Sequence, residues 1–294
     1  MWFNFFSKKR KLDLDPSRAK ATYALYDETR GYAHYTRQCQ DAFRGNRHSK
    51  PSLLEQQGIE HLTILEEKNA DDFLSQLPSV TQKAYSKPEM DYSEFLQIRD
   101  QGFLLQWFQK IFSTELTNKI RDYFGSEFLI YWHAFLKAQP ADQPTRSFLW
   151  HCDKGPSSHL KILLYLNDFQ EHQGNTIFLD RATTDKFAKI GYVFGPVKKR
   201  IEDLGELAKQ NGMTFQAHSW EMQAGQGIIF EPAQVLHRGW LPSTGHRYVL
   251  VFCLLPSPMH WQVMFDRTNG EGFSSGYTWH EDAQKLWEEV QGQN

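Results

Sequence analysis

A histidine and an aspartate stand two residues apart in the segment 150–153. Residues two apart on a β-strand point to the same face, so His151 and Asp153 can present an imidazole and a carboxylate to one metal ion. A third nitrogen ligand is available from His237, within a later apolar run. Two histidines and one carboxylate leave three positions of an octahedral ion open, which suits Fe(II) and dioxygen chemistry. A surface or structural His–Asp pair is the alternative, since the chain has 12 histidines.

An arginine on the following apolar run extends this possible site. Arg247 opens the run 247–255, and the residues at two-residue spacing from it are apolar. An unpaired charge buried on such a row is very costly, whereas a ligand carboxylate held by two guanidinium nitrogens satisfies it. We therefore predict that Arg247 binds the carboxylate of a cosubstrate. An internal ion pair with Glu231 or Asp153 is the alternative interpretation.

Two hydroxyl groups on neighbouring runs are further candidates for contact with that cosubstrate. Tyr165 shares one face of the run 160–166 with Lys161 and Leu163, and Thr176 begins the next run. A hydroxyl both donates and accepts hydrogen bonds, so Tyr165 and Thr176 are predicted to bind the ligand beside Arg247. A core tyrosine that reaches a backbone carbonyl is the alternative for Tyr165. Four isolated histidines are interpreted as ordinary polar residues, namely His133, His159, His172 and His218.

The elements that must position these residues are mostly strands. Beyond Tyr92, apolar runs of strand length are separated by turn-forming residues. They are 128–137, 148–153, 160–166, 176–179, 219–222, 227–230, 235–240 and 247–255. The segment 102–105 is predicted as one more short strand. Ser113 is a predicted N-cap for a helix that reaches Tyr123 and ends at Gly125.

The rest of the chain is predicted to flank this mainly β core. Helical patterns are expected at 16–43, 69–77, 197–211 and 279–290. The insertion at about 181–217 is interpreted either as a lid or as a cover for one face of the barrel. The predicted division is a helical or irregular N-terminal extension (1–90), a β domain (91–260) and a C-terminal helical tail (261–294).

Taken together, the motifs resemble the 2-oxoglutarate and Fe(II)-dependent oxygenase superfamily, and within it the phytanoyl-CoA dioxygenase-like branch. The likeness rests on His151-x-Asp153, on His237 before an Arg-Gly pair, and on Arg247 ten positions later. The segments 102–104 and 225–230 are also similar to that branch. The resemblance covers roughly residues 92–258.

This resemblance implies a double-stranded β-helix of jelly-roll or cupin-like type. It implies that His151, Asp153 and His237 bind Fe(II), that Arg247 binds 2-oxoglutarate, and that O2 is consumed. The expected reaction is hydroxylation of a small or carrier-linked organic substrate, with release of succinate and CO2. Asp153 favours oxygen insertion over chlorination, because halogenating members of the superfamily lack this carboxylate.

The chain departs from the branch in the segment 174–181, which lacks its usual Gly-Pro or Gly-Gly pair and its Pro-Gly-Ser-His sequence. The substrate class therefore stays open. Two other functions also stay open: a β-helix binding module that retains a metal without turnover, and a cupin-like metalloenzyme that does not use 2-oxoglutarate. Retention of all four residues speaks against the first, and Arg247 speaks against the second.

The amino-acid composition bears on the partners and the cellular compartment of the protein. Lysine and arginine number 33 against 35 acidic residues, and a net charge of -2 gives no reason to expect a nucleic acid partner. Three scattered cysteines without a C-x-x-C pair favour a reducing, cytoplasmic compartment. No apolar stretch is long enough to span a bilayer. The aromatic opening and the basic run 8–11 do not form a secretory signal, and are interpreted as a disordered tail or a membrane-surface contact.

Overall fold

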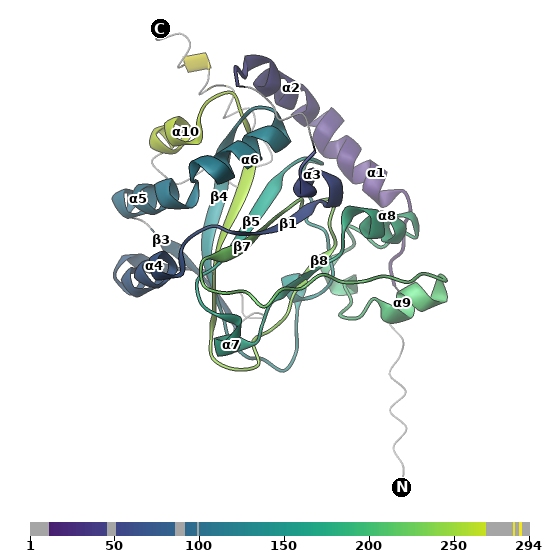
Figure 1. Cartoon of the computed structure of the whole chain (residues 1–294). Helices are drawn as coiled ribbons and strands as arrows, with labels where there is room; N and C mark the ends of the chain where they lie inside the picture. The colour runs from purple at the N-terminus through teal and green to yellow at the C-terminus, as the bar shows by residue number, and fades with distance from the viewer. Residues whose placement is uncertain are drawn as a thin grey trace.

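The computed structural model describes residues 12–45, 51–85, 92–98, 100–268, 285 and 288–289. Its described strands are β1 (Ile59–Thr63), β2 (Thr81–Tyr85), β3 (Ser93–Ile98), β4 (Glu127–Ala138), β5 (Leu160–Tyr165), β6 (Thr176–Phe178), β7 (Gln226–Phe230), β8 (His237–Gly239) and β9 (Arg247–Ser257). Seven of them form one antiparallel sheet in the order β1-β7-β5-β9-β4-β3-β2, and β6 pairs with β8 in a second sheet (Figure 1).

From β4 onward the chain alternates between these two sheets. The strands β4, β5, β7 and β9 lie side by side in the large sheet. The smaller sheet is extended on either side of β6 and β8 by single bridges, one between His151 and His237 and one between Phe178 and His218. This alternation is that of a double-stranded β-helix. The predicted mainly β fold with flanking helices is thereby confirmed.

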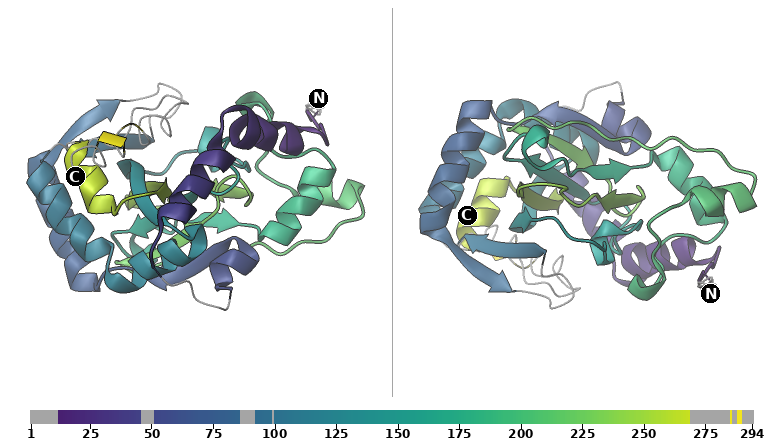
Figure 2. Two further views of the ribbon diagram at one scale, coloured as in Figure 1. Left: turned by 90° about the horizontal axis from the view of Figure 1, so that it is seen from above. Right: turned by 90° about the horizontal axis from the view of Figure 1, so that it is seen from below.

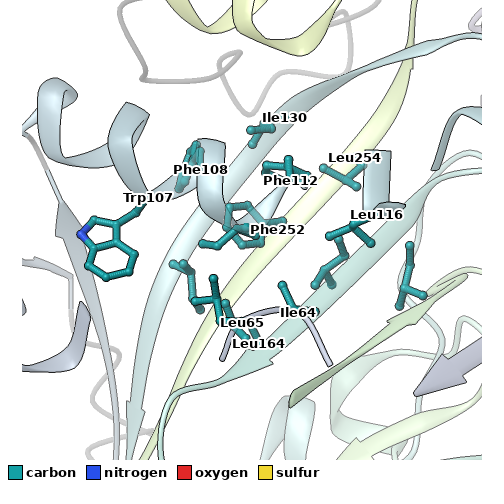
Figure 3. Packing of buried hydrophobic residues seen from close by; sticks show 14 of the residues in the cluster. Ile64, Leu65, Trp107, Phe108, Phe112, Leu116, Ile130, Leu164, Phe252 and Leu254 are labelled. Carbon is teal, nitrogen blue, oxygen red and sulfur yellow. The ribbon is translucent and has the colours of Figure 1, made fainter. Parts of the chain in front are cut away.

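Helices cover the outer face of the large sheet. They are α4 (Glu67–Val80), α5 (Gln101–Ile111), α6 (Thr114–Phe124) and α10 (Trp261–Arg267). The aromatic rings of Phe108 and Phe112 lie 5.0 and 5.1 Å from the ring of Phe252 on β9, at the centre of the largest apolar cluster (Figure 3). Burial of these rings supplies much of the hydrophobic stabilisation that holds the sheet against its helices.

The two-residue period of the strands separates this outer core from the interior between the sheets. On β5, Ile162 and Leu164 belong to the outer cluster, whereas Leu163 and Tyr165 face the smaller sheet. The inner face of the large sheet packs against Phe178 of β6 and Val235 just before β8. The site residues predicted from the sequence lie within this interior.

The N-terminal region and the insertion carry further helices. The first region contains α1 (Arg18–Tyr23), a π-helix (Ala24–Thr29), α2 (Tyr32–Ala42) and α3 (Leu53–Gln57), and the second contains α8 (Arg181–Lys189) and α9 (Gly205–Gln210). Views from above and below place α9 across the sheet from α4 and α5 (Figure 2). The phenol of Tyr23 donates a 3.0 Å hydrogen bond to the carbonyl of Ala233, which ties α1 to the barrel.

Several local predictions were wrong. The segment 102–105 is helical, because Asp100 caps α5 by accepting a hydrogen bond from the amide of Phe103 at 2.8 Å and the apolar residues that follow lie on one helical face. The runs 148–153 and 219–222 form no continuous strand: the first contributes a single bridge at His151, and the second only follows a bridge at His218. The helix predicted at 197–211 is a single 3-10 turn followed by the short α9, and α8 was not predicted.

The N-terminal 90 residues contribute strands as well as the predicted helices. The strand β1 pairs with β7 and β2 pairs with β3, so both lengthen the large sheet. The division into an extension, a β domain and a tail stays a prediction. The basic run 8–11 lies outside the described residues, and so does the helix predicted at 279–290 apart from 285, 288 and 289. Within the described part of the chain, no helix is both long and apolar enough to cross a membrane.

The turn before β7 requires a glycine at position 225. Gly225 has φ +86°, and a Cβ at this position would lie 2.3 Å from the carbonyl oxygen of Leu65. We expect Gly225→Ala to lower the free energy of unfolding by about 3 kcal/mol, from backbone strain and the clash together. Gly212→Ala is the matched control, because Gly212 has φ +62° and a Cβ added there would meet nothing within 4 Å. It is expected to cost about 1 kcal/mol. The two free energies of unfolding are measured by urea denaturation. Equal losses in the two variants would contradict the role of the close contact between position 225 and Leu65.

Candidate metal centre

The structure brings together the three residues predicted as metal ligands. The bridge between His151 and His237 consists of two backbone hydrogen bonds, of 3.0 and 2.9 Å, which set the two imidazoles side by side. The amide of Asp153 donates to the carbonyl of Pro232 at 2.8 Å, and this contact holds its carboxylate near both rings. One donor atom from each of the three side chains lies within 4.8 Å of the others.

The hydrogen bonds of the two imidazoles orient their free nitrogens toward Asp153. The Nδ1 atom of His151 lies 2.7 Å from the carbonyl of Leu149, and that of His237 lies 2.9 Å from the carbonyl of Val235. Because a carbonyl can only accept, Nδ1 carries the proton in each ring and Nε2 keeps its lone pair. The two Nε2 atoms lie 3.4 and 3.9 Å from the carboxylate oxygens of Asp153. Such backbone support of the remote nitrogen is typical of histidine metal ligands.

Electrostatics keep all three groups in the form that binds a metal. Burial lowers the pKa of His151, although the carboxylate of Asp153, which would accept a hydrogen bond from the protonated ring and attract its charge, acts in the other direction. Burial, and then the neighbouring His151, hold the pKa of His237 well below its usual value. Burial alone would raise the pKa of Asp153, but the ammonium of Lys161 and the two imidazoles hold it well below its usual range. At neutral pH the cluster is therefore two neutral imidazoles and one carboxylate.

Lys161 on β5 forms an ion pair with the carboxylate of Asp153. Its side chain is 18% exposed, so this ammonium lies largely inside the barrel. The sequence predicted that Lys161 shares a face of its strand with Leu163 and Tyr165, but it gave Lys161 no role. The signal that it missed is the one used for Arg247, a cation on an otherwise apolar interior row that needs a partner.

Arg247 lies at the other end of the interior and has no acidic partner among the described residues. Its Nη1 donates to the carbonyls of Asn175 at 2.7 Å and Trp240 at 2.9 Å, while its Nε is buried without any hydrogen bond. The two acids considered as alternative partners are engaged elsewhere, Glu231 with Arg181 and Asp153 with Lys161. A guanidinium that is 2% exposed and only partly satisfied fits an anionic ligand.

Tyr165 and Thr176 lie buried in the same part of the barrel. The phenol of Tyr165 donates a 3.0 Å hydrogen bond to the hydroxyl of Thr176, and not to a backbone carbonyl. In the smaller sheet Thr176 pairs with Gly239 and Phe178 pairs with His237. Two residues along a strand span about 7 Å, so Thr176 lies about the length of a small dicarboxylic acid from the histidine pair.

A narrow pocket reaches His151 from the side of the N-terminal region and the insertion. Its wall includes the apolar side chains of Trp150, Phe194 and Leu236, and also Arg18 and Arg200. Trp150 and Leu236 pack in one apolar cluster with residues of the insertion, so the insertion forms part of this wall. Whether it moves as a lid stays a prediction.

The other histidines weighed at the sequence level take no part in the cluster. Among the described residues, the only group of three or more His, Cys, Asp or Glu residues that could hold a metal ion is His151, Asp153 and His237. His133 packs edge-on against the ring of Phe108 at 5.2 Å, and the Nδ1 of His159 lies 2.7 Å from the carbonyl of Pro156.

No protein-family model and no curated protein matches the sequence. Among solved structures, the chain is similar to HygX from Streptomyces hygroscopicus with nickel and 2-oxoglutarate bound, at 14% identity and TM-score 0.45, covering 71% of this chain and 86% of that one. It is similar to EctD from S. alaskensis with 2-oxoglutarate and 5-hydroxyectoine, at 16% identity and TM-score 0.47, covering 72% and 79%. It is also similar to SnoN, a non-heme alpha ketoglutarate dependent epimerase, at 11% identity and TM-score 0.48, covering 76% and 82%.

Proposed function

We propose that this chain is a non-haem Fe(II) and 2-oxoglutarate-dependent oxygenase that hydroxylates a small or carrier-linked organic substrate. The observation that carries this proposal is the pairing of two features in one barrel interior. One is the cluster of two neutral imidazoles and a carboxylate, and the other is the buried, partly unsatisfied guanidinium of Arg247. A metal centre alone does not require the second feature.

The side chains present fit the proposed metal and cosubstrate. His151 and His237 would bind Fe(II) through Nε2, and Asp153 would bind it through its carboxylate. Three protein ligands leave positions for an oxo-acid and for O2, as expected for iron oxygenases of this ligand type. The orphaned Nε of Arg247 fits the distal carboxylate of 2-oxoglutarate, with Tyr165 and Thr176 as neighbouring hydroxyl groups.

Bound Fe(II) would supply the reduction of O2, coupled to oxidative decarboxylation of 2-oxoglutarate. In balance, substrate C–H, O2 and 2-oxoglutarate yield substrate C–OH, succinate and CO2. The side chains of the protein orient the cosubstrate and exclude water from the metal centre. Arg247 fixes one end of the cosubstrate, and the rings of Phe178 and Phe230, with centroids 6.2 and 4.9 Å from that of His237, shield one side of the metal centre.

The experiment that tests this proposal is the anaerobic visible spectrum of the protein with Fe(II) and 2-oxoglutarate. We expect a weak charge-transfer band that is absent from His151→Ala and retained by His246→Ala. His246 is the matched control, because its ring packs against Tyr248 outside the cluster. If the protein bound iron but showed no charge-transfer band, the proposal would be wrong. It would mean that the oxo-acid does not chelate iron, and would favour the binding module or the cupin-like enzyme.

The ion pair of Lys161 with Asp153 predicts a stability effect that depends on metal. Lys161→Met leaves a carboxylate that is 27% exposed without its ammonium partner, which is expected to cost the metal-free protein about 2 kcal/mol and to lower Tm by about 5 °C. Saturating Ni(II) should raise Tm more in this variant than in the wild type, because the metal then compensates the carboxylate charge.

Lys119→Met is the control for this prediction. Lys119 forms a 2.6 Å ion pair with Glu60 and has a similar exposed fraction of 22%, but it lies outside the cluster. Its loss is expected to lower Tm without changing the shift caused by Ni(II). Equal Ni(II) shifts in the wild type and Lys161→Met would contradict the assigned role of Lys161.

A further inference from the structure

One cation on the wall of the pocket that reaches His151 has no acidic partner among the residues that the structure describes. The Nη1 of Arg200 donates to the carbonyl of Arg146 at 3.1 Å, and its Nε is buried without a hydrogen bond. No hydrogen bond joins this Nε to the phenol of Tyr192, whose hydroxyl donates to the carbonyl of Trp150 and accepts from the amide of Ile201, both at 3.0 Å.

Three acids near the pocket pair with other cations. Asp13 pairs with Arg18 at 3.0 Å, and Asp153 pairs with Lys161. Glu202 pairs with Arg238 at 3.1 Å. Burial lowers the pKa of Arg200 below its usual value, with the charge of Asp153 acting in the other direction. An arginine remains protonated at any physiological pH, so Arg200 holds a partly buried positive charge that no acid in the described part of the chain contacts.

The positive charge of Arg200 also stays unbalanced when the metal centre holds Fe(II) and 2-oxoglutarate. If the proposed function holds, Fe(II) and Arg247 together balance Asp153 and the two carboxylates of 2-oxoglutarate. The ammonium of Lys161, beside Asp153, and the guanidinium of Arg200, on the pocket wall, then remain as excess positive charges. An interior with surplus positive charge favours a ligand that brings negative charge.

We propose that the substrate carries an anionic group, a phosphate or a carboxylate, that binds Arg200 while its reacting carbon faces the metal centre beside His151. The planar guanidinium presents parallel donors to such a group, and the buried Nε is one of them. The apolar side chains of Trp150, Phe194 and Leu236 line the same pocket as Arg200, so the part of the substrate next to the anionic group would be apolar. The free volume of the pocket is about 20 Å³, so the pocket must widen to admit this ligand. This inference rests on the proposed function for the meaning of the metal centre, but the anion site itself does not.

The test is calorimetric binding of phenyl phosphate, benzoate and benzyl alcohol to the full chain, with and without saturating anaerobic Fe(II) and 2-oxoglutarate. Saturation occupies the metal centre and Arg247, so that the remaining anion site is measured alone. We expect at least one of the two anions to bind, and Arg200→Gln to weaken it at least about tenfold. The affinity for benzyl alcohol should be the same in the wild type and in Arg200→Gln. If only phenyl phosphate binds, the anionic group of the substrate is a phosphate; if only benzoate binds, it is a carboxylate.

Two further variants keep the result interpretable. Lys198→Gln removes the same charge from an exposed side chain two positions away that does not line the pocket, and should change anion affinity less than about twofold. Arg200→Lys retains the charge without the planar fork and should give an intermediate loss. Absence of anion binding to the wild type, or equal losses in Arg200→Gln and Lys198→Gln, would overturn the inference.

The spectrum of the same samples separates the two proposals. A charge-transfer band with no Arg200-dependent anion binding would overturn the anionic substrate alone. Arg200-dependent binding without a band would overturn the oxygenase function and leave an anion-binding pocket in place.

Discussion

Replacement of His237 by alanine is expected to weaken Fe(II) binding more than about 100-fold and to abolish turnover. Loss of groups that only support a metal ligand typically costs about 10–100-fold, so loss of a direct ligand should cost more. The effect should be specific to the side chain, because the backbone hydrogen bonds between positions 151 and 237 remain available in the variant. Iron content after desalting and calorimetric titration with Fe(II) under anaerobic conditions measure it.

The control for this prediction is again His246→Ala, which removes an imidazole outside the cluster. Circular dichroism and thermal unfolding of both variants establish that the fold is retained. If His237→Ala bound Fe(II) as tightly as the wild type, the assignment of His237 as a ligand would be wrong. The two remaining side chains, His151 and Asp153, would then have to bind the metal with another group.

The second large effect is expected at Arg247. Arg247→Ala should raise the Kd for 2-oxoglutarate by about 30-fold or more while Fe(II) stays bound, because the distal carboxylate would be buried without its charged partner. The same change removes the donors to the carbonyls of Asn175 and Trp240, so some loss of stability is expected as well. Titration of the charge-transfer band with 2-oxoglutarate measures the affinity directly.

Arg238→Ala is the matched control for Arg247→Ala. Arg238 is also buried, at 6% exposure, but its guanidinium pairs with Glu202 at 3.1 Å. Its removal should leave the affinity for 2-oxoglutarate within about twofold. Arg247→Lys, which retains the charge but not the planar pair of donors, should fall between the wild type and Arg247→Ala. Unaltered cosubstrate affinity in Arg247→Ala would remove the assignment.

Much of the fold and of the candidate site could be predicted because strand geometry is local. A two-residue period places Tyr165 with Lys161 and Leu163 on one face of β5 whatever the rest of the chain does, and the structure retains that arrangement. Ser113 was recognised as a helix cap, and its hydroxyl accepts from the amide of Leu116 at the start of α6.

Prediction of secondary structure failed where a short apolar run fits both the two-residue period of a strand and the 3.6-residue period of a helix. The segment 102–105 has too few residues to separate a strand from a helix, and only the wider spacing of Leu104, Trp107, Phe108 and Ile111 along α5 decides it. The strands β1 and β2 were missed because their pairing with β7 and β3 stabilises segments whose own composition is weakly strand-like.

The sequence by itself determined that Arg247 shares a face with Val249 and Val251 on the inner row of β9. It did not determine how His151 and Asp153 meet, because the run 148–153 is no continuous strand and backbone hydrogen bonds to His237 and Pro232 place the two side chains. Only the tertiary structure decided their partners, because a partner is set by long-range packing and not by local period. It paired Asp153 with Lys161, engaged Glu231 with Arg181, and so left Arg247 without an acid among the described residues. It also folded the insertion back over the barrel, which placed Arg200 on the wall of a pocket that reaches His151.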